Sequence, residues 1–197
     1  MRKFLIPHLK QRTIEKIKNL YRLLGSIEIK MKKKILFICI FFVGFLTQAV
    51  FSVEPKSLGK YKSWEAFAYN DGKGKVCFAQ TIPTEKSPKN LKRDESRLFV
   101  TFRKDEKIKN EISVTSGHAY KKSSVVAKSG KNDFSFFSQG KFAWVSDGEE
   151  EFNLIKVMKK ASKLSISASD SNGKKTKDLY SMMGFTKAYN TAKKSCA

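Results

Sequence analysis

Histidine and cysteine are scarce in this sequence of 197 residues. Histidine occurs only as His8 and His118, and cysteine only as Cys39, Cys77 and Cys196. Catalytic triads and most zinc sites need histidine or several cysteines, so the sequence offers few residues for either kind of site. Only six of the 40 basic residues are arginine, the side chain that binds phosphates and bases in a bidentate manner. We therefore expect no enzyme active site, no metal or other cofactor, and no specific nucleic-acid partner.

Long apolar runs are also rare, and residues 31–52 contain the most prominent one. Three lysines lead into twelve apolar residues from Ile35 to Leu46, and small residues follow. This order is typical of a secretory signal peptide. Twelve helical residues span about 18 Å, less than the ~30 Å of a membrane core, so we favour cleavage over the alternative of an uncleaved anchor. Cleavage is expected after Ser52, with Ala49 as the other acceptable position.

The signal peptide divides the chain into three parts. Residues 1–30 are basic and weakly amphipathic, and we interpret them as an upstream extension that arises from a misassigned start codon, with translation beginning at Met31. A transit peptide or a cytoplasmic helix is the alternative. Residues 53–197 are expected to form one domain of 145 residues, which is enough for an adequate core.

The domain remains basic after the signal peptide is removed. It keeps 29 basic and 16 acidic residues, a net charge of +13. The lysines are scattered singly and in pairs, which favours a solvated lysine-rich surface. A surface that binds an anionic envelope polymer, such as lipopolysaccharide or polysaccharide, is the alternative.

The two cysteines of the domain form an even pair. Cys39 leaves with the signal peptide, so Cys77 and Cys196 remain in a chain that is expected to reach an oxidising compartment. We predict one disulfide between them, with two buried free thiols as the alternative.

Short segments in which apolar and polar residues alternate, separated by turn residues, predict an antiparallel β-sandwich or barrel. Residues 53–62 are expected to be a polar lead-in and residues 82–95 a surface loop. The expected strands cover residues 64–69, 76–81, 97–103, 111–115, 123–127, 134–137, 139–145, 163–168 and 177–182.

Two helices are predicted among these strands. Asp147, followed three residues later by Glu150, resembles a capping arrangement, and one or two helical turns are expected after it. A terminal helix is expected with Thr186 as its cap. The residues that fall on one face of this helix are Phe185, Tyr189, Ala192 and Cys196. Cys196 would then point toward the body of the domain, where the disulfide would pin the helix.

Three polar motifs could carry chemistry, and each has a simpler explanation. His118 follows a strand with no acidic partner in sequence, so we expect a histidine in a turn or on the surface with its hydrogen bonds satisfied. Residues 149–151 are three glutamates that could bind a hard cation, but an acidic helix start explains them better. Residues 72–75 lack the strand-loop-helix context of a phosphate loop and are expected to form a hairpin turn.

Several aromatic residues could stack on sugars or bases. They are Trp64, Trp144 and the phenylalanines of residues 134–137. At strand spacing such residues more often belong to the core, and we place them there.

The order of motifs along the domain resembles that of the invasion-associated locus B family, which consists of exported alphaproteobacterial proteins. The resemblance rests on the order of these motifs and on the positions of the two cysteines, and no single motif is chemically diagnostic. The matching features are Trp64, the Cys-Phe-Ala-Gln segment 77–80, Pro83, the Gly-Lys-Phe-Ala-Trp segment 140–144, residues 178–188 and Cys196.

The resemblance implies an immunoglobulin-like antiparallel β-sandwich with a short C-terminal helix, located in the periplasm or at the outer surface. It implies no enzyme activity, and in pathogens the family is associated with entry into host cells. We therefore expect a non-catalytic exported interaction module with an envelope or extracellular protein as partner. Contact with a membrane is expected only through the signal segment.

Overall fold

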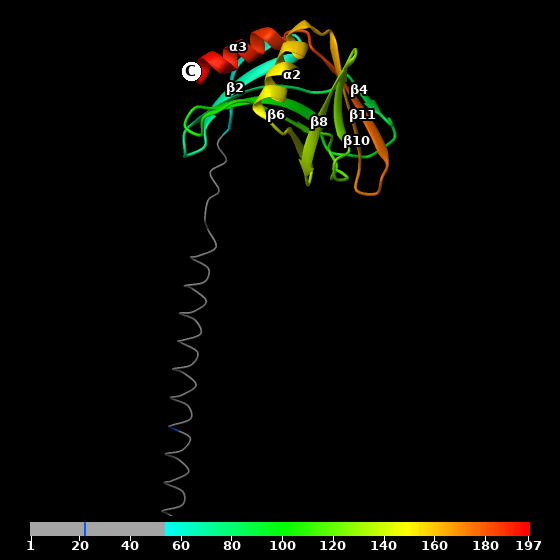
Figure 1. Cartoon of the computed structure of the whole chain (residues 1–197). Coiled ribbons are helices and arrows are strands. Elements are labelled where there is room, and N and C mark those ends of the chain that lie inside the picture. Colours follow the sequence, from blue (N-terminus) through cyan, green and yellow to red (C-terminus); the bar gives the residue numbers. More distant parts are fainter. Residues whose placement is uncertain (1–21, 23–53) are drawn as a thin grey trace, which may run out of the picture. The chain divides into compact units, whose positions relative to one another are not determined.

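The computed structural model describes residue 22 and residues 54–197, so the predicted upstream extension and signal peptide lie outside the described residues. Residues 54–197 are mainly β with two helices (Figure 1), as predicted. Within the described part of the chain, no helix has the length and apolar character needed to span a membrane. The elements are β1 (Lys56–Tyr61), β2 (Trp64–Asn70), β3 (Lys75–Thr81), β4 (Glu85–Ser87), β5 (Arg97–Arg103), β6 (Ile108–Thr115), β7 (Val125–Ser129), β8 (Asn132–Gln139), β9 (Phe142–Val145), α2 (Gly148–Lys160), β10 (Lys163–Ser169), β11 (Lys175–Ser181) and α3 (Phe185–Ser195).

All eleven strands belong to one antiparallel sheet with the order β1-β2-β3-β5-β6-β9-β8-β7-β10-β11-β4. Strands that are far apart in this order come into contact, which shows that the sheet bends strongly. The indole N–H of Trp64, at the start of β2, donates to the carbonyl of Ser181 at the end of β11 over 2.9 Å. The backbone N–H of Ser63 likewise donates to the carbonyl of Met183 over 3.2 Å.

The inner face of the bent sheet encloses a single apolar core. Alternate residues of each strand point inward, as Trp64, Ala66 and Ala68 do in β2. Helix α3 packs on β1, β2, β3 and β5, while α2 packs on β6, β8 and β9. The buried residues of both helices join this core (Figure 1), and among residues 54–197 no helix packs on the opposite face of the sheet.

Helix α3 presents the predicted face to this core. Phe185, Tyr189, Ala192 and Cys196 are all buried. The Sγ atoms of Cys77 on β3 and Cys196 lie 2.01 Å apart, so the predicted pair is confirmed at disulfide distance. The predicted cap is wrong. The helix begins at Phe185, so the N-cap position is taken by Gly184, which has a φ of 92° and makes no side-chain capping hydrogen bond.

Helix α2 is longer than the one or two turns predicted. Its cap is the predicted one, since the Asp147 carboxylate accepts hydrogen bonds from the backbone N–H groups of Glu149 and Glu150, both over 2.9 Å. The helix continues to Lys160 because Leu154, Ile155 and Met158 all reach the core. In the sequence this stripe is interrupted by Lys156 and Val157, which separate Ile155 from Met158.

The secondary structure of three segments differs from the prediction. The polar lead-in contains the edge strand β1, which pairs with β2 and rests Leu58 and Tyr61 against the core. The loop 82–95 contains β4, a three-residue strand that pairs with β11. The predicted strand 139–145 crosses a turn, because Gly140 has a φ of 59° and only Phe142–Val145 form β9.

The loop before β5 also buries a charge. Arg93 forms an ion pair with Asp178 of β11, and the two side chains are 3% and 0% exposed. Its Nη1 atom donates to Asp178 Oδ2 over 2.9 Å and to the carbonyl of Ser116 over 2.8 Å. This arginine therefore ties the loop to β11 and to the end of β6.

Candidate functional site

The outer face of the sheet carries a row of aromatic side chains across β2, β3, β5, β9 and β8. The solvent face of an antiparallel sheet is normally polar, so this composition is unusual. Phe137 and Phe142 are 49% and 45% exposed, and the other members are half-buried. We call this row the aromatic face, and its members are Phe67, Tyr69, Phe78, Phe99, Phe137, Phe142 and Trp144.

Strand register brings the rings of the aromatic face together. Phe67 lies opposite Phe78, with stacked rings 5.2 Å apart. Phe137 lies opposite Trp144, with stacked rings 5.4 Å apart. A shallow hollow of about 540 Å³, lined by Phe78, Phe99, Phe142, Trp144 and their neighbours, joins the two groups. The two groups of rings thus lie on either side of β6 and line the same hollow.

The far half of the sheet differs. On β10 and β11 the outward positions are taken by residues such as Ser165, Ser167 and Lys177. These are the small and charged side chains expected on a solvated sheet. The aromatic composition is therefore specific to one half of the outer surface.

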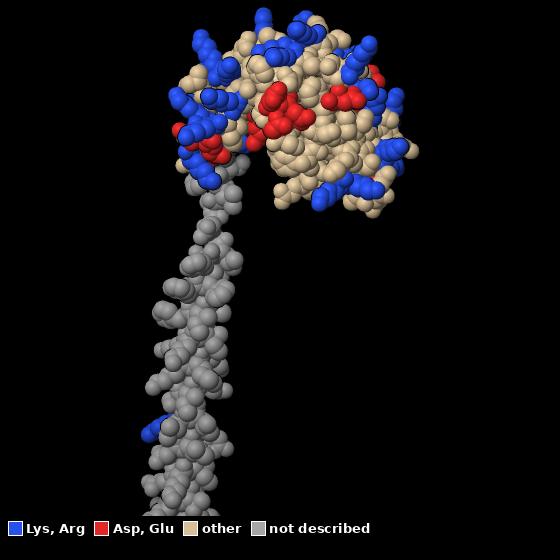
Figure 2. Space-filling view, viewed as in Figure 1, with Lys and Arg blue, Asp and Glu red and all other residues tan. Residues whose placement is uncertain are grey.

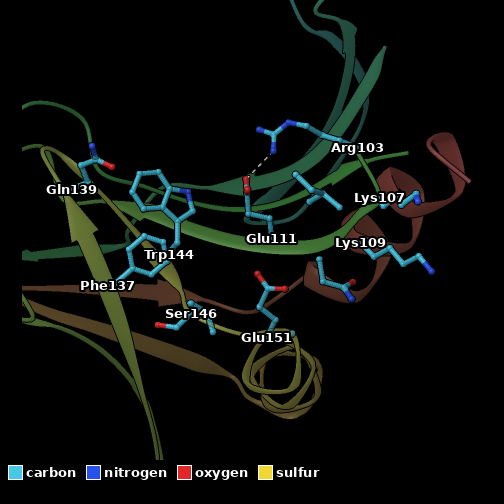
Figure 3. A pocket seen from close by; sticks show the side chains of 13 residues that line it. Arg103, Lys107, Lys109, Glu111, Phe137, Gln139, Trp144, Ser146 and Glu151 are labelled. Carbon is cyan, nitrogen blue, oxygen red and sulfur yellow. Dashed lines mark hydrogen bonds and ion pairs between the residues drawn. The ribbon is translucent and has the colours of Figure 1, made fainter. Parts of the chain in front are cut away.

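A cleft of about 830 Å³ lies at the edge of the aromatic face (Figure 3). It exists because β6 and β9 pair only through Ser113–Trp144 and Val114–Ala143, so the earlier part of β6 has no β9 partner. Trp144 and Phe137 line one side, the strands of Arg103 and Glu111 line the other, and the start of α2 contributes Glu151 (Figure 3). The volume is in the range of known ligand sites.

The guanidinium and the two carboxylates of the cleft come from three elements. Arg103 Nη1 of β5 donates to Glu111 Oε1 of β6 over 3.1 Å. Glu151 of α2 accepts a hydrogen bond from the backbone N–H of Ile112 over 3.2 Å, which satisfies a donor that lacks a strand partner. Partial burial raises the pKa of Glu151, and the negative charges of Glu111 and Asp147 act in the same direction. The cleft thus offers acceptors from two carboxylates and donors from one guanidinium.

The raised pKa of Glu151 predicts a pH-dependent contribution to stability. Because the folded state holds this proton more tightly than the unfolded chain, stability falls as pH rises from about 4.5, the ordinary pKa, through the higher folded value. Glu151→Gln keeps the acceptor for Ile112 and removes the charge. We expect a higher thermal midpoint than the parent at pH 7 and an equal one at pH 3, with a gain below about 1 kcal/mol because water reaches the group.

The control for this prediction is Glu149→Gln, an exposed carboxylate in the same helical turn. It should not raise the midpoint at pH 7, because this residue keeps its full hydration. A Glu151→Gln variant that is less stable than the parent at pH 7 would show that the ionised carboxylate stabilises the helix instead.

The aromatic residues singled out in the sequence separate into two groups. Trp64, Phe134 and Phe136 are buried in the core, as predicted. The same prediction is wrong for Phe137 and Trp144, which point outward. Sequence reasoning also missed Phe67, Tyr69, Phe78, Phe99 and Phe142, although their alternation with buried neighbours such as Ala66 and Cys77 was the available signal.

The polar motifs occupy structural positions. The ring nitrogens of His118 lie 3.1 Å from the carbonyl of Ala119 and 2.9 Å from the Thr176 hydroxyl. Residues 149–151 form the first turn of α2, and residues 72–75 lie at the hairpin between β2 and β3. Within the described residues, no group of three or more acidic, histidine or cysteine side chains is arranged to hold a metal ion.

Comparison with protein-family models, with curated proteins and with solved structures finds no match to this chain. The resemblance to the invasion-associated locus B family therefore stays a prediction from the motifs alone.

Proposed function

We propose that this protein is a non-catalytic exported interaction module of the invasion-associated locus B type, with an immunoglobulin-like strand arrangement and an envelope or extracellular partner. The aromatic face is its binding surface. A periplasmic or secreted location follows from the signal-like segment and agrees with the paired cysteines.

The observation that carries the proposal is the exposure of Phe137 and Phe142, beside the half-buried Trp144, next to a cleft of ligand size. Aromatic side chains are enriched at the centres of binding surfaces because they bury a large area at a low cost in side-chain entropy. An exposed apolar patch on one half of a sheet is typical of such sites. Arg103, Glu111 and Glu151 of the cleft already take part in hydrogen bonds within the protein, which supports binding rather than catalysis.

Site-specific photo-crosslinking in cells tests the proposal. A benzophenone amino acid in place of Phe137 is expected to yield an adduct of higher mass in the envelope fraction. The same group in place of Phe152, an exposed phenylalanine of α2, is the matched control and should yield none. Trp144→Ala should remove the adduct at position 137, because it removes the neighbouring ring. Mass spectrometry of the same sample should place the protein's N-terminus near Val53.

Two results would contradict the proposal. Equal adducts at positions 137 and 152 would show that the aromatic face is not selective. An adduct at position 137 that survives Trp144→Ala together with Phe142→Ala would show that the contact does not depend on these rings.

A further inference from the structure

A strip of lysines adjoins the cleft at the end away from the aromatic face. Lys104, Lys107, Lys109 and Lys193 are all exposed. They line a hollow of about 440 Å³ beside the end of α3, together with Phe102 and Ile108. Figure 2 shows basic side chains gathered around this end of α3. We call these four residues the lysine strip.

The lysine strip forms no ion pairs within the described part of the chain. None of the four lysines forms an ion pair with a carboxylate of residues 54–197. Asp105 and Glu106 belong to the same turn but line a separate hollow next to the β2–β3 hairpin. Burial, followed by repulsion from Lys193, lowers the pKa of nearby Lys159. An anionic ligand would relieve this concentration of positive charge.

The lysine strip and the aromatic face form one continuous track. The cleft and the lysine-lined hollow share Lys107, Ile108 and Lys109. The cleft and the shallow aromatic hollow share Arg103, Glu111 and Trp144. A single extended ligand can therefore lie on the rings, pass the carboxylates of the cleft and reach the lysines.

We propose that the ligand of this track is an acidic polysaccharide, in which sugar rings stack on the aromatic face and acidic substituents reach the lysine strip. This inference rests on the proposed binding function of the aromatic face and adds the chemical class of the ligand. The charge complementarity between the unpaired lysines and an acidic chain is the observation that selects it.

A single-stranded nucleic acid also combines stacking with negative charge. The carboxylates of the cleft favour a polysaccharide over this alternative. Glu111 and Glu151 offer acceptor oxygens in the middle of the track. Sugar hydroxyls can donate to them, whereas the phosphate of every nucleotide would be repelled. The strip is also built from lysine, and the one arginine of the cleft already holds Glu111. These features favour a hydroxyl-rich chain with spaced charges.

Titration of the purified protein with three probes tests the inference. They are a hyaluronan hexasaccharide with a carboxylate on every second sugar, neutral chitohexaose, and oligothymidylate dT12. Tryptophan fluorescence reports on the track, because Trp64 is fully buried and Trp144 lines the cleft. We expect a saturable change with the hyaluronan fragment, with weaker binding of chitohexaose and dT12. Affinity for the hyaluronan fragment should fall as salt is raised.

Paired variants assign the two halves of the track, with affinities measured by calorimetry. Phe137→Ala with Phe142→Ala should weaken hyaluronan binding at least about tenfold, and Phe152→Ala should leave it unchanged. Lys107→Ala with Lys109→Ala should weaken binding and reduce its salt dependence. Lys175→Ala with Lys177→Ala, two exposed lysines of β11, is the matched control and should change neither.

Three outcomes would overturn the inference. Equal, salt-independent binding of chitohexaose would exclude the acidic substituent, and tighter binding of dT12 would identify a nucleic acid as the ligand. Binding of none of the probes, while the crosslink at position 137 still forms and depends on Trp144, would reject the polysaccharide and leave the proposed function standing. Loss of that crosslink dependence would instead reject the proposed function itself.

Discussion

Asp178→Ala is expected to lower the free energy of unfolding by about 3–5 kcal/mol, because it leaves the charge of Arg93 buried without its partner. The pair is almost completely shielded from water, and Arg93 also holds the carbonyl of Ser116. The loss should appear as a lower denaturant midpoint without a change in slope. The loop before β5 should be among the first regions to exchange amide hydrogen.

A paired replacement keeps this prediction testable if the single variant fails to fold. Arg93→Met with Asp178→Leu removes both charges, and it should be clearly more stable than Asp178→Ala because no unpaired charge remains. The exposed pair Lys141–Asp94, with side chains 57% and 70% exposed, provides the comparison. Lys141→Ala should cost less than about 1 kcal/mol. A similarly small effect of Asp178→Ala would mean that water reaches Arg93 when the carboxylate is removed.

Cys196→Ser, or reduction of the parent, is expected to cost about 2–5 kcal/mol of unfolding free energy. The Cys77–Cys196 pair closes a loop with a sequence separation of 119 residues and joins β3 to α3. In the chain-entropy model, breaking it returns freedom mainly to the unfolded state. Midpoints measured with and without reductant give the size of the effect, and Cys77→Ser with Cys196→Ser should not respond to reductant.

The structure changes the expected local consequence of breaking the disulfide. Helix α3 has anchors besides Cys196, because Phe185 and Ala192 are buried and the Tyr189 hydroxyl donates to Asn110 over 2.6 Å. Faster amide exchange should therefore be limited to the last turn, after Ala192. Exchange that accelerates along the whole of α3 would show that the disulfide is its main anchor. Two free thiols in the denatured, unreduced protein would show that the bond does not form.

Local patterns predicted most of the fold because the inner face of most strands is apolar. Residues 97–103 alternate cleanly, and the observed β5 has the same bounds. The failures have a common physical cause, which is that tertiary contacts stabilise segments with polar sequences. Strand β1 forms because β2 offers a pairing edge, and α2 extends because the core receives its apolar stripe. Neither contact is visible from the segment alone.

The candidate site was less predictable because burial depends on which face of the sheet is covered. Trp64 and Trp144 have similar strand contexts, but only the face of Trp64 is closed by α3. The cleft was not predictable at all, since it depends on the shortness of the β6–β9 ladder and on where α2 begins. Cysteine pairing was predictable because only two cysteines remain in the domain.

The two edge strands of the sheet are protected against pairing with other chains. An edge strand with free backbone donors and acceptors can recruit strands from neighbouring molecules, and this leads to aggregation. At one end β1 carries Lys56 and Lys60 and a register shift at Gly59, which interrupts regular pairing. At the other end β4 is only three residues long, and Pro88, which lacks a backbone N–H, follows it. We therefore expect the sheet to end at eleven strands even in concentrated solution, so that the exposed aromatic rings, rather than the strand edges, decide with what the protein associates.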